Sequence, residues 1–346
     1  MRPLWRRGRF AVIVGLLSLL YLGAALAPVV APYTPRSQQR QLAYAPPRRP
    51  HWIDRQGRFH ARPFVYALDS RLIEGTRTYA ESDRRLPIYF WTAGEPYRWL
   101  GLPLERHLFG LEPGQQPWFP LGADRFGRDL FTRLLYGSQI SLTIGPVAIV
   151  LTLLVGLLVG GLAGYRGGWY DVIAMRLAEL LLSLPGLFLL LALRAVFPSD
   201  LSAGSTYAVI VFLFALVGWA SVARVVRGIV LGLKQEEYVQ AAQAVGGRHT
   251  RIFVRHLLPG LRGYLLVQAT FLVPAFMLAE VTLSFLGLGI QEPDASWGNL
   301  LTEALSVHTL RHHSWILIPA ALIFLAAFCF HWIGDQLAER FNSRGQ

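Results

Sequence analysis

The sequence has little charge and few of the residues from which many soluble active sites are built. Of its 346 residues, 16% are charged and 53% are hydrophobic. The single cysteine, Cys329, excludes a disulfide framework and a cysteine-based zinc or iron–sulfur site. The single lysine, Lys234, lies between Leu233 and Gln235, so an ordinary Gly-Lys-Ser/Thr phosphate-binding loop is absent. Neither Gly-x-Ser-x-Gly nor His-Glu-x-x-His occurs, and the composition excludes a disordered chain.

The hydrophobic residues lie in runs long enough to cross a bilayer, which needs about 20 apolar residues per helix. Residues 10–31, 140–165, 201–223 and 314–334 contain no Asp, Glu, Lys or Arg. Two further runs contain charges: 172–197 has Arg176, Glu179 and Arg194, and 264–290 has Glu280. The sequence therefore predicts an all-α polytopic membrane protein with six transmembrane helices. The first run could be a cleaved signal, but its length favours a retained helix.

The distribution of basic residues predicts the orientation. With the N-terminus inside, the inner segments carry Arg2 and its neighbours, Arg166, seven basic residues between 224 and 262, and Arg344, whereas the short outer segments carry only Arg311. Both termini are then cytoplasmic. The outer segment 32–137 has 16 arginines and 10 acidic residues, but segments this long cross regardless of charge. The basic excess thus reflects membrane topology rather than a nucleic-acid surface.

Composition divides the chain into three parts. Residues 1–31 form the cytoplasmic N-terminus and first transmembrane helix. Residues 32–120 are polar, aromatic and punctuated by proline, and a strand-like run at 86–91 predicts a small mixed extracytoplasmic domain between helices one and two. It has no set of residues arranged for catalysis, and we expect it to serve as a docking or shielding module. Residues 121–346 carry the other five helices, where Gly156, Gly160 and Gly164 allow another helix to approach closely.

The longest inner loop spans residues 224–263. Within its stretch at 232–260, a short helix is predicted at 236–245, and Gly246-Gly247 is predicted to end it. Ala241 and Ala242 give this helix a smooth side, and Tyr238 and Val245 add apolar contact area. Such a helix suits insertion into a partner's groove, or alternatively it lies on the lipid surface.

The loop pattern Ala241-Ala242-x3-Gly246-x9-His256-x-Leu258-Pro259 resembles the EAA loop of bacterial ABC-transporter permeases. Gln240 stands where that family has glutamate, and His256 where isoleucine is frequent. Residues 121–137, Gly164 to Asp171, and Glu280 to Gly298 resemble signatures of the C-type subunit of dipeptide, oligopeptide and nickel permeases. The resemblance covers about residues 119–340, and the enlarged 32–120 segment exceeds the usual short loop.

This resemblance implies the six-helix bundle of a type I ABC importer in the bacterial inner membrane. Its implied partners are a homologous second permease, two ATPase subunits and an extracytoplasmic solute-binding protein. ATP and magnesium would bind the ATPases, and this chain would bind no cofactor. The implied ATPase-coupling loop spans residues 232–260, and its implied coupling residues are Tyr238, Gln240, Ala241, Ala242, Gly246, Leu258 and Pro259.

Glu280 and Ser284 are candidates for the translocation path or its gate. An acid at mid-membrane costs about 2.5–3.5 kcal/mol on insertion scales, so we expect Glu280 to face the bundle interior or water. A buried packing contact is an equally good interpretation.

The outer-mouth motif consists of Asp124, Gly127, Arg128, Asp129 and Arg133. Its charged members are expected to form ion pairs, with Asp124 and Arg128 four residues apart if the segment is helical. An exposed pair contributes only about 0–1 kcal/mol, so local structure is favoured over a gate-linked network. His308, His312 and His313 are interpreted as solvated loop residues, and no metal site is expected.

Two other functions remain open. A proton-driven secondary transporter would need an inverted repeat and membrane carboxylates, of which only Glu280 stands out. A non-transporting scaffold for the outer domain is the third hypothesis.

Overall fold

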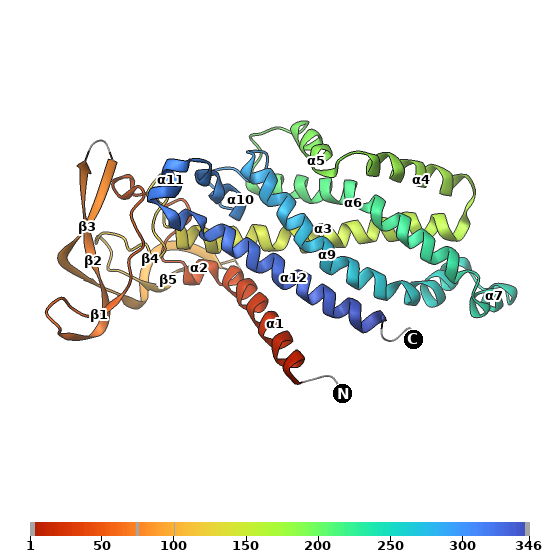
Figure 1. The fold of residues 1–346 in the computed structure, drawn as a ribbon, viewed down its shortest axis with the longest axis horizontal. Helices are drawn as coiled ribbons and strands as arrows, with labels where there is room; N and C mark the ends of the chain where they lie inside the picture. Colours follow the sequence, from red (N-terminus) through yellow and green to blue (C-terminus); the bar gives the residue numbers. More distant parts are fainter. Residues whose placement is uncertain (1–3, 74–75, 100, 343–346) are drawn as a thin grey trace. The chain divides into compact units, whose positions relative to one another are not determined.

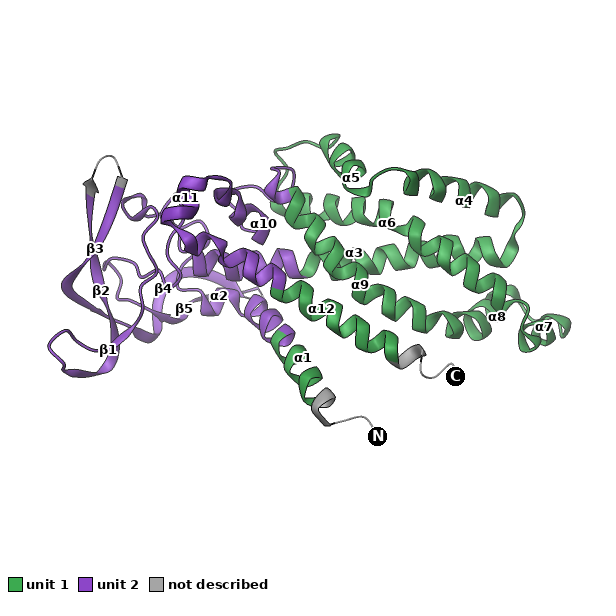
Figure 2. Ribbon diagram, in the orientation of Figure 1, with its two compact units in different colours: residues 1–16, 143–283, 325–346 green, residues 17–142, 284–324 purple. Residues whose placement is uncertain are grey.

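The structure, a computed structural model, describes residues 4–73, 76–99 and 101–342 (Figure 1). Arg2 and Arg344, which contribute to the predicted orientation, lie outside these residues. Two compact units are distinguished, each built from segments distant in sequence (Figure 2). Unit 1 comprises 1–16, 143–283 and 325–346, and unit 2 comprises 17–142 and 284–324.

Within the described residues, five helical segments are long and apolar enough to cross a membrane. They are contained in α1 (Leu4–Ala25), α3 (Leu130–Arg166), α6 (Ala203–Leu233), α9 (Leu258–Phe285) with the turns before it, and α12 (Ile318–Asn342). The shorter helices and turns are α2 (Ala27–Val30), η1 (Arg40–Leu42), α7 (Glu237–Ala244), α8 (His249–Ile252), η2 (Phe253–Leu257), α10 (Trp297–Leu300), η3 (Leu301–Leu305), α11 (Val307–His312) and η4 (Ser314–Leu317).

The predicted span at 172–197 is broken rather than continuous. Helix α4 (Gly168–Ser183) and helix α5 (Gly186–Ala195) meet at an angle of 94°. Pro185 lacks a backbone N–H and disfavours helical geometry at the residue before it, and Leu184 is extended. The described chain therefore has five candidate spans, or six if this bent pair counts as one.

The segment after α2 forms two small antiparallel sheets. One has the order β1 (His51–Ile53), β2 (Phe59–Ile73), β3 (Thr76–Pro87), and the other pairs β4 (Tyr89–Trp99) with β5 (Leu102–Gly110). Ser70 lies opposite Tyr79 in the first sheet, and Thr92 opposite His107 in the second. The strand-like run at 86–91 covers the end of β3 and the start of β4. Buried Val65, Leu86 and Trp118 belong to one hydrophobic cluster of this segment.

Small residues bring α3 and α6 into close contact within unit 1. A Cβ atom on Gly160 would lie 2.2 Å from the carbonyl oxygen of Ala223, and one on Gly156 would lie 2.6 Å from Val222. A Cβ on Gly164 would lie 2.8 Å from the carbonyl oxygen of Arg227. The predicted close helix approach at these three glycines is thus confirmed, and the partner helix is α6.

Candidate functional site

Helix α7 covers Glu237–Ala244, close to the helix predicted at 236–245. Gly246, just beyond it, has a φ of +79°, a left-handed conformation that favours glycine. The amide of Gly246 donates to the carbonyl of Gln243, and that of Gly247 donates to the carbonyl of Ala242. The glycine pair therefore ends the helix by satisfying its last carbonyls.

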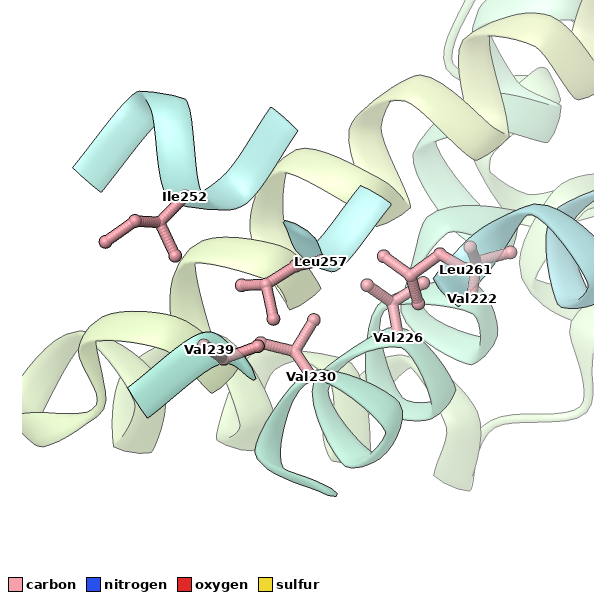
Figure 3. Packing of buried hydrophobic residues seen from close by; sticks show 7 residues of the cluster. All are labelled: Val222, Val226, Val230, Val239, Ile252, Leu257 and Leu261. Carbon is pink, nitrogen blue, oxygen red and sulfur yellow. The ribbon is translucent and has the colours of Figure 1, made fainter. Parts of the chain in front are cut away.

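A single fully buried residue, Val239, anchors α7 to the rest of unit 1 (Figure 3). It lies beside Val230 of α6 and belongs to a hydrophobic cluster, here called the anchor cluster. The members of the anchor cluster are Val222, Val226, Val230, Val239, Ile252, Leu257 and Leu261. This cluster therefore packs α7 against α6, α8, η2 and the start of α9.

The rest of α7 is largely open to solvent in this chain. Tyr238 is 48% exposed, Val245 is 89% exposed, and Ala241 is also exposed. Ala242 is only half-buried and packs against the anchor cluster, so the two alanines do not share one free face. Tyr238 and Ala241 of α7, together with Val245 at its C-terminal cap, are here called the docking face.

Polar contacts support the loops around α7. The Nζ of Lys234 donates to the carbonyl of Tyr165 at 2.8 Å, and the Tyr165 hydroxyl lies 2.9 Å from Nδ1 of His249. Gln240 is exposed and donates through Nε2 to the carbonyl of Gln235 at 3.2 Å. Leu258 and Pro259 are half-buried at the first positions of α9, directly after the π-helical turn η2.

An ion pair joins α6 to α4 in unit 1. Arg227 donates to both carboxylate oxygens of Asp171, at 2.5 and 2.6 Å. Asp171 ends one of the resembled family motifs, and Arg227 is one of the seven basic residues between 224 and 262. Nothing in their spacing along the sequence predicts that they pair.

Three charged residues of the outer-mouth motif, Asp124, Arg128 and Arg133, are buried in unit 2 and pair with one another and with Glu292, whose side chain is 37% exposed. Arg128 donates through Nε to Oδ2 of Asp124 at 2.6 Å and through both terminal nitrogens to Glu292. Arg133 donates to both oxygens of Glu292 at 3.1 Å and reaches Oδ2 of Asp124 at 3.4 Å. Arg128 is 2% exposed and Arg133 is 0% exposed, so two full charges are removed from water.

The expected ion pairing is present for Asp124, Arg128 and Arg133, whereas Asp129 makes no ion pair with another described residue, and the segment is not helical. Residues 124–128 form a turn closed by the pairing of Ala123 with Asp129, not a helix. Oδ1 of Asp124 accepts the amides of Phe126 and Arg128, and Gly127 completes the turn at φ +73°. A Cβ on Gly127 would lie 1.9 Å from the carbonyl oxygen of Gln39, which requires glycine there.

Burial raises the pKa values of three carboxyl groups in and around this cluster. It raises the pKa of Asp124, and it raises the pKa of Glu303 to about 7, with the nearby Asp124 charge adding to the effect. Burial also raises the pKa of Asp129 to about 7, although Thr132 donates to its carboxylate. Glu303 accepts the amide of Arg125 at 3.3 Å. Neither Glu292 nor Glu303 was selected from the sequence as a member of this cluster.

The two candidates for the translocation path are both buried. Glu280 is 0% exposed in α9, which agrees with the expectation that it faces an interior. Ser284 is 1% exposed, and its hydroxyl accepts the amide of Ile290 at 3.0 Å.

The three loop histidines occupy α11 and the residue after it. His308 and His312 are exposed, with ring centroids 4.5 Å apart, and His313 stacks on Tyr44 at 4.3 Å. Across the residues that the structure describes, no group of three or more His, Cys, Asp or Glu side chains is arranged to hold a metal ion.

Apolar helices long enough to span a membrane and glycine-mediated helix packing define a multi-pass membrane protein. Residues 156–343 match the family model described as "Binding-protein-dependent transport system inner membrane component". The chain belongs to this family, and it is a permease component of a transport system, not an enzyme.

Characterised relatives support the same assignment. The dipeptide transport system permease protein DppC of Bacillus subtilis (strain 168) is 40% identical over 235 residues, which cover 68% of this chain and 71% of that protein. The oligopeptide transport system permease protein OppC of the same strain is 38% identical, over 67% of this chain and 73% of that protein. One solved structure is described as the crystal structure of an amino acid ABC transporter with histidines. Its match covers 60% of this chain and 94% of that transporter's chain, at 18% sequence identity and a TM-score of 0.45.

Proposed function

We propose that this chain is the C-type permease subunit of an ATP-driven importer for peptides, and that its docking face receives movement from separate ATPase subunits. The observation that carries the proposal is the state of α7: one side chain, Val239, is fully buried, while Tyr238, Ala241 and Val245 are exposed. An exposed helix of this kind suits a groove on a partner protein. The peptide substrate is supported by the names of the dipeptide and oligopeptide relatives.

The anchor cluster provides the route by which the movement reaches the membrane helices. Val226 and Val230 come from α6, and Leu261 comes from α9. Packed interiors transmit displacement because they contain little empty space. When a partner shifts α7, Val239 therefore carries α6 and α9 with it, and the bundle changes the side on which it is open.

The proposed assembly contains a homologous second permease, two ATPase subunits and an extracytoplasmic solute-binding protein. ATP and magnesium belong to the ATPases, and this chain binds no cofactor. Both termini and α7 lie in the cytoplasm, whereas the β-strands lie outside. Tyr238, Gln240, Ala241, Ala242, Gly246, Leu258 and Pro259 form or support the coupling region.

Glu280 and Ser284 are proposed to line or support the translocation path of the assembled transporter. The ion cluster of Asp124, Arg128, Arg133 and Glu292 is proposed to hold the outer end of α3 in one geometry while the helices move. Nothing in the comparisons supports the proton-driven alternative.

The decisive experiment replaces Ala241 by tryptophan. Because Ala241 is exposed, Ala241→Trp should leave the chain folded while preventing close docking of a partner. We expect loss of labelled dipeptide uptake and of peptide-stimulated ATP hydrolysis in proteoliposomes containing the whole transporter. The matched control is Ala80→Trp, an exposed position on β3.

Normal ATP-dependent uptake by the Ala241→Trp transporter would overturn the coupling role. Uptake that persists without any ATPase, driven by an imposed proton gradient, would overturn the ATP-driven assignment. Uptake of nickel but not of di- or tripeptides would overturn the substrate class alone.

A further inference from the structure

Unit 2 contains a cavity of about 330 Å³ that the transport proposal does not use. Its walls come from β4 and β5, from the segment at 32–39, from the loop at 110–119 and from Asp129. This volume is at the lower end of the range of small-molecule sites, which is about 300–1,000 Å³. The cavity is thus large enough for a small organic molecule.

The ionisable walls of this cavity are mainly acidic. Glu95, Glu112 and Asp129 all line it, and none makes an ion pair with another residue that the structure describes. Glu95 accepts the amide of Thr34 at 2.9 Å and the hydroxyl of Ser37 at 2.7 Å. The amide of Thr34 and the hydroxyl of Ser37 are both neutral donors.

Two acceptor oxygens at this site are buried and lack a partner among the described residues. Asp129 is 3% exposed; its Oδ2 accepts the amide and hydroxyl of Thr132 at 2.9 and 2.7 Å, whereas its Oδ1 has no partner. Gln115 donates through Nε2 to Glu112 at 3.1 Å, and its Oε1 also has no partner. Unsatisfied buried acceptors are costly, and a ligand with N–H donors would remove that cost.

The histidine in the wall has no nitrogen left for a ligand. Nδ1 of His107 lies 2.5 Å from the carbonyl of Ala31, and Nε2 lies 2.9 Å from the carbonyl of Glu95. Together with the absence of a metal-holding group among the described side chains, this favours an organic cation over a metal ion. An ammonium group has three donors and no acceptor, which complements walls rich in free acceptors.

We propose that this cavity binds the primary ammonium group of a small molecule, with Asp129 and Gln115 as acceptors. The ammonium group belongs either to a free aliphatic amine or to the N-terminus of a short peptide. This site is separate from the docking face and does not depend on the transport proposal.

The test is isothermal titration calorimetry on the full chain in lipid nanodiscs. The probes are butylamine, trialanine and N-acetyl-trialanine. We expect saturable binding of butylamine, trialanine or both, and none of N-acetyl-trialanine, which lacks the ammonium group. Binding of butylamine alone assigns the site to free amines, and binding of trialanine alone assigns it to peptide N-termini.

Variants identify the cavity as the place of binding. Asp129→Asn removes the charge but keeps a side chain that can cap α3, and we expect about tenfold weaker binding. Glu112→Gln, at the same cavity, is a second variant in case Asp129→Asn does not fold, and it should also weaken binding. Glu105→Gln is the control, because Glu105 is exposed and does not line the cavity.

Three results would overturn the proposal. They are the absence of saturable binding by either amine-bearing probe, equal binding of N-acetyl-trialanine, and unchanged affinity in both folded cavity variants. Because transport is not the readout, failure here leaves the proposed import function standing, and failure of import leaves this site standing.

Discussion

Arg133 carries a permanent charge and yet has no exposed surface. A buried ion pair is expensive to desolvate, and it is stable only when its hydrogen bonds are well satisfied. Here Glu292 accepts from both Arg128 and Arg133, and Asp124 accepts from the same two arginines. Each charge in the cluster therefore depends on the others.

Replacing one charged residue of the cluster should destabilise the chain. Arg133→Met keeps much of the side-chain volume but leaves Asp124 and Glu292 with Arg128 as their shared cation. We expect the free energy of unfolding to fall by about 3 kcal/mol. Arg125→Met is the control: the Arg125 side chain is 49% exposed, and its pair with Glu303 at 3.8 Å should contribute less than about 1 kcal/mol. Denaturant unfolding in detergent measures both, and equal losses would contradict the buried-cluster argument.

Glu303 predicts a pH dependence of stability. Its pKa is about 7 in the folded chain, against an ordinary value of 4.5. The folded chain thus binds more protons than the unfolded chain between pH 4.5 and 7, so its free energy of unfolding falls as pH rises through this window. Glu303→Gln removes this contribution. The Tm of the variant relative to that of the native chain should therefore rise between pH 5 and pH 8.

The control for this measurement is Glu105→Gln, which replaces an exposed carboxylate. Its Tm difference from the native chain should stay constant over the same pH range. A difference that is flat for Glu303→Gln as well would show that Glu303 is not protonated near neutral pH.

At the scale of elements, helix packing depends on individual glycines. Gly160 allows α3 to contact the backbone of α6, whereas a Cβ on Gly228 would meet nothing within 4 Å. Gly160→Ala should therefore destabilise the chain by about 1–3 kcal/mol through overpacking. Gly228→Ala should be neutral or slightly stabilising, because alanine favours the helix. Unfolding free energies of the two variants that did not differ would contradict direct contact between α3 and α6.

Local sequence signals predicted some elements well and others poorly. Gly246-Gly247 predicted the end of α7 because a left-handed residue stops a helix by its own backbone preference. Proline has different effects at two positions: the chain breaks at Pro185, whereas α9 continues through Pro274. A proline removes one hydrogen bond in either case, and packing by distant residues decides whether the helix continues.

At the scale of the whole molecule, the orientation is open to direct measurement. Cys329 is buried, so Cys329→Ala gives a background without cysteine. On that background, Asp83→Cys should react with a membrane-impermeant maleimide in intact cells, because its side chain is 92% exposed and the strands are proposed to lie outside. Thr250→Cys, exposed beside α7, should react only after permeabilisation. The reverse pattern would invert the topology.

Contacts between residues far apart in the chain could not be predicted from the sequence. The membrane spans are predicted by apolar runs, the loop motif at 241–259 by the spacing of its residues, and the ion pairs at 124–133 by the closeness of opposite charges. Glu292 joins Arg128 from 164 residues away, and Arg227 joins Asp171 from 56 residues away. The burial of Val239 is not predicted either, because one valine in a short polar helix gives no periodic hydrophobic pattern. These ion pairs and this burial depend on the tertiary fold, and residue spacing in the sequence does not reveal them.

The division of labour within α7 has an evolutionary consequence. Val239 holds the helix in place, whereas Tyr238, Ala241 and Val245 face outward and contribute little to the folding of this chain. Substitutions at the outward positions can therefore accumulate without loss of the membrane subunit. Under the proposed coupling role, gene duplication followed by divergence at those three positions would give paralogous permeases that discriminate between different ATPases in the same cell.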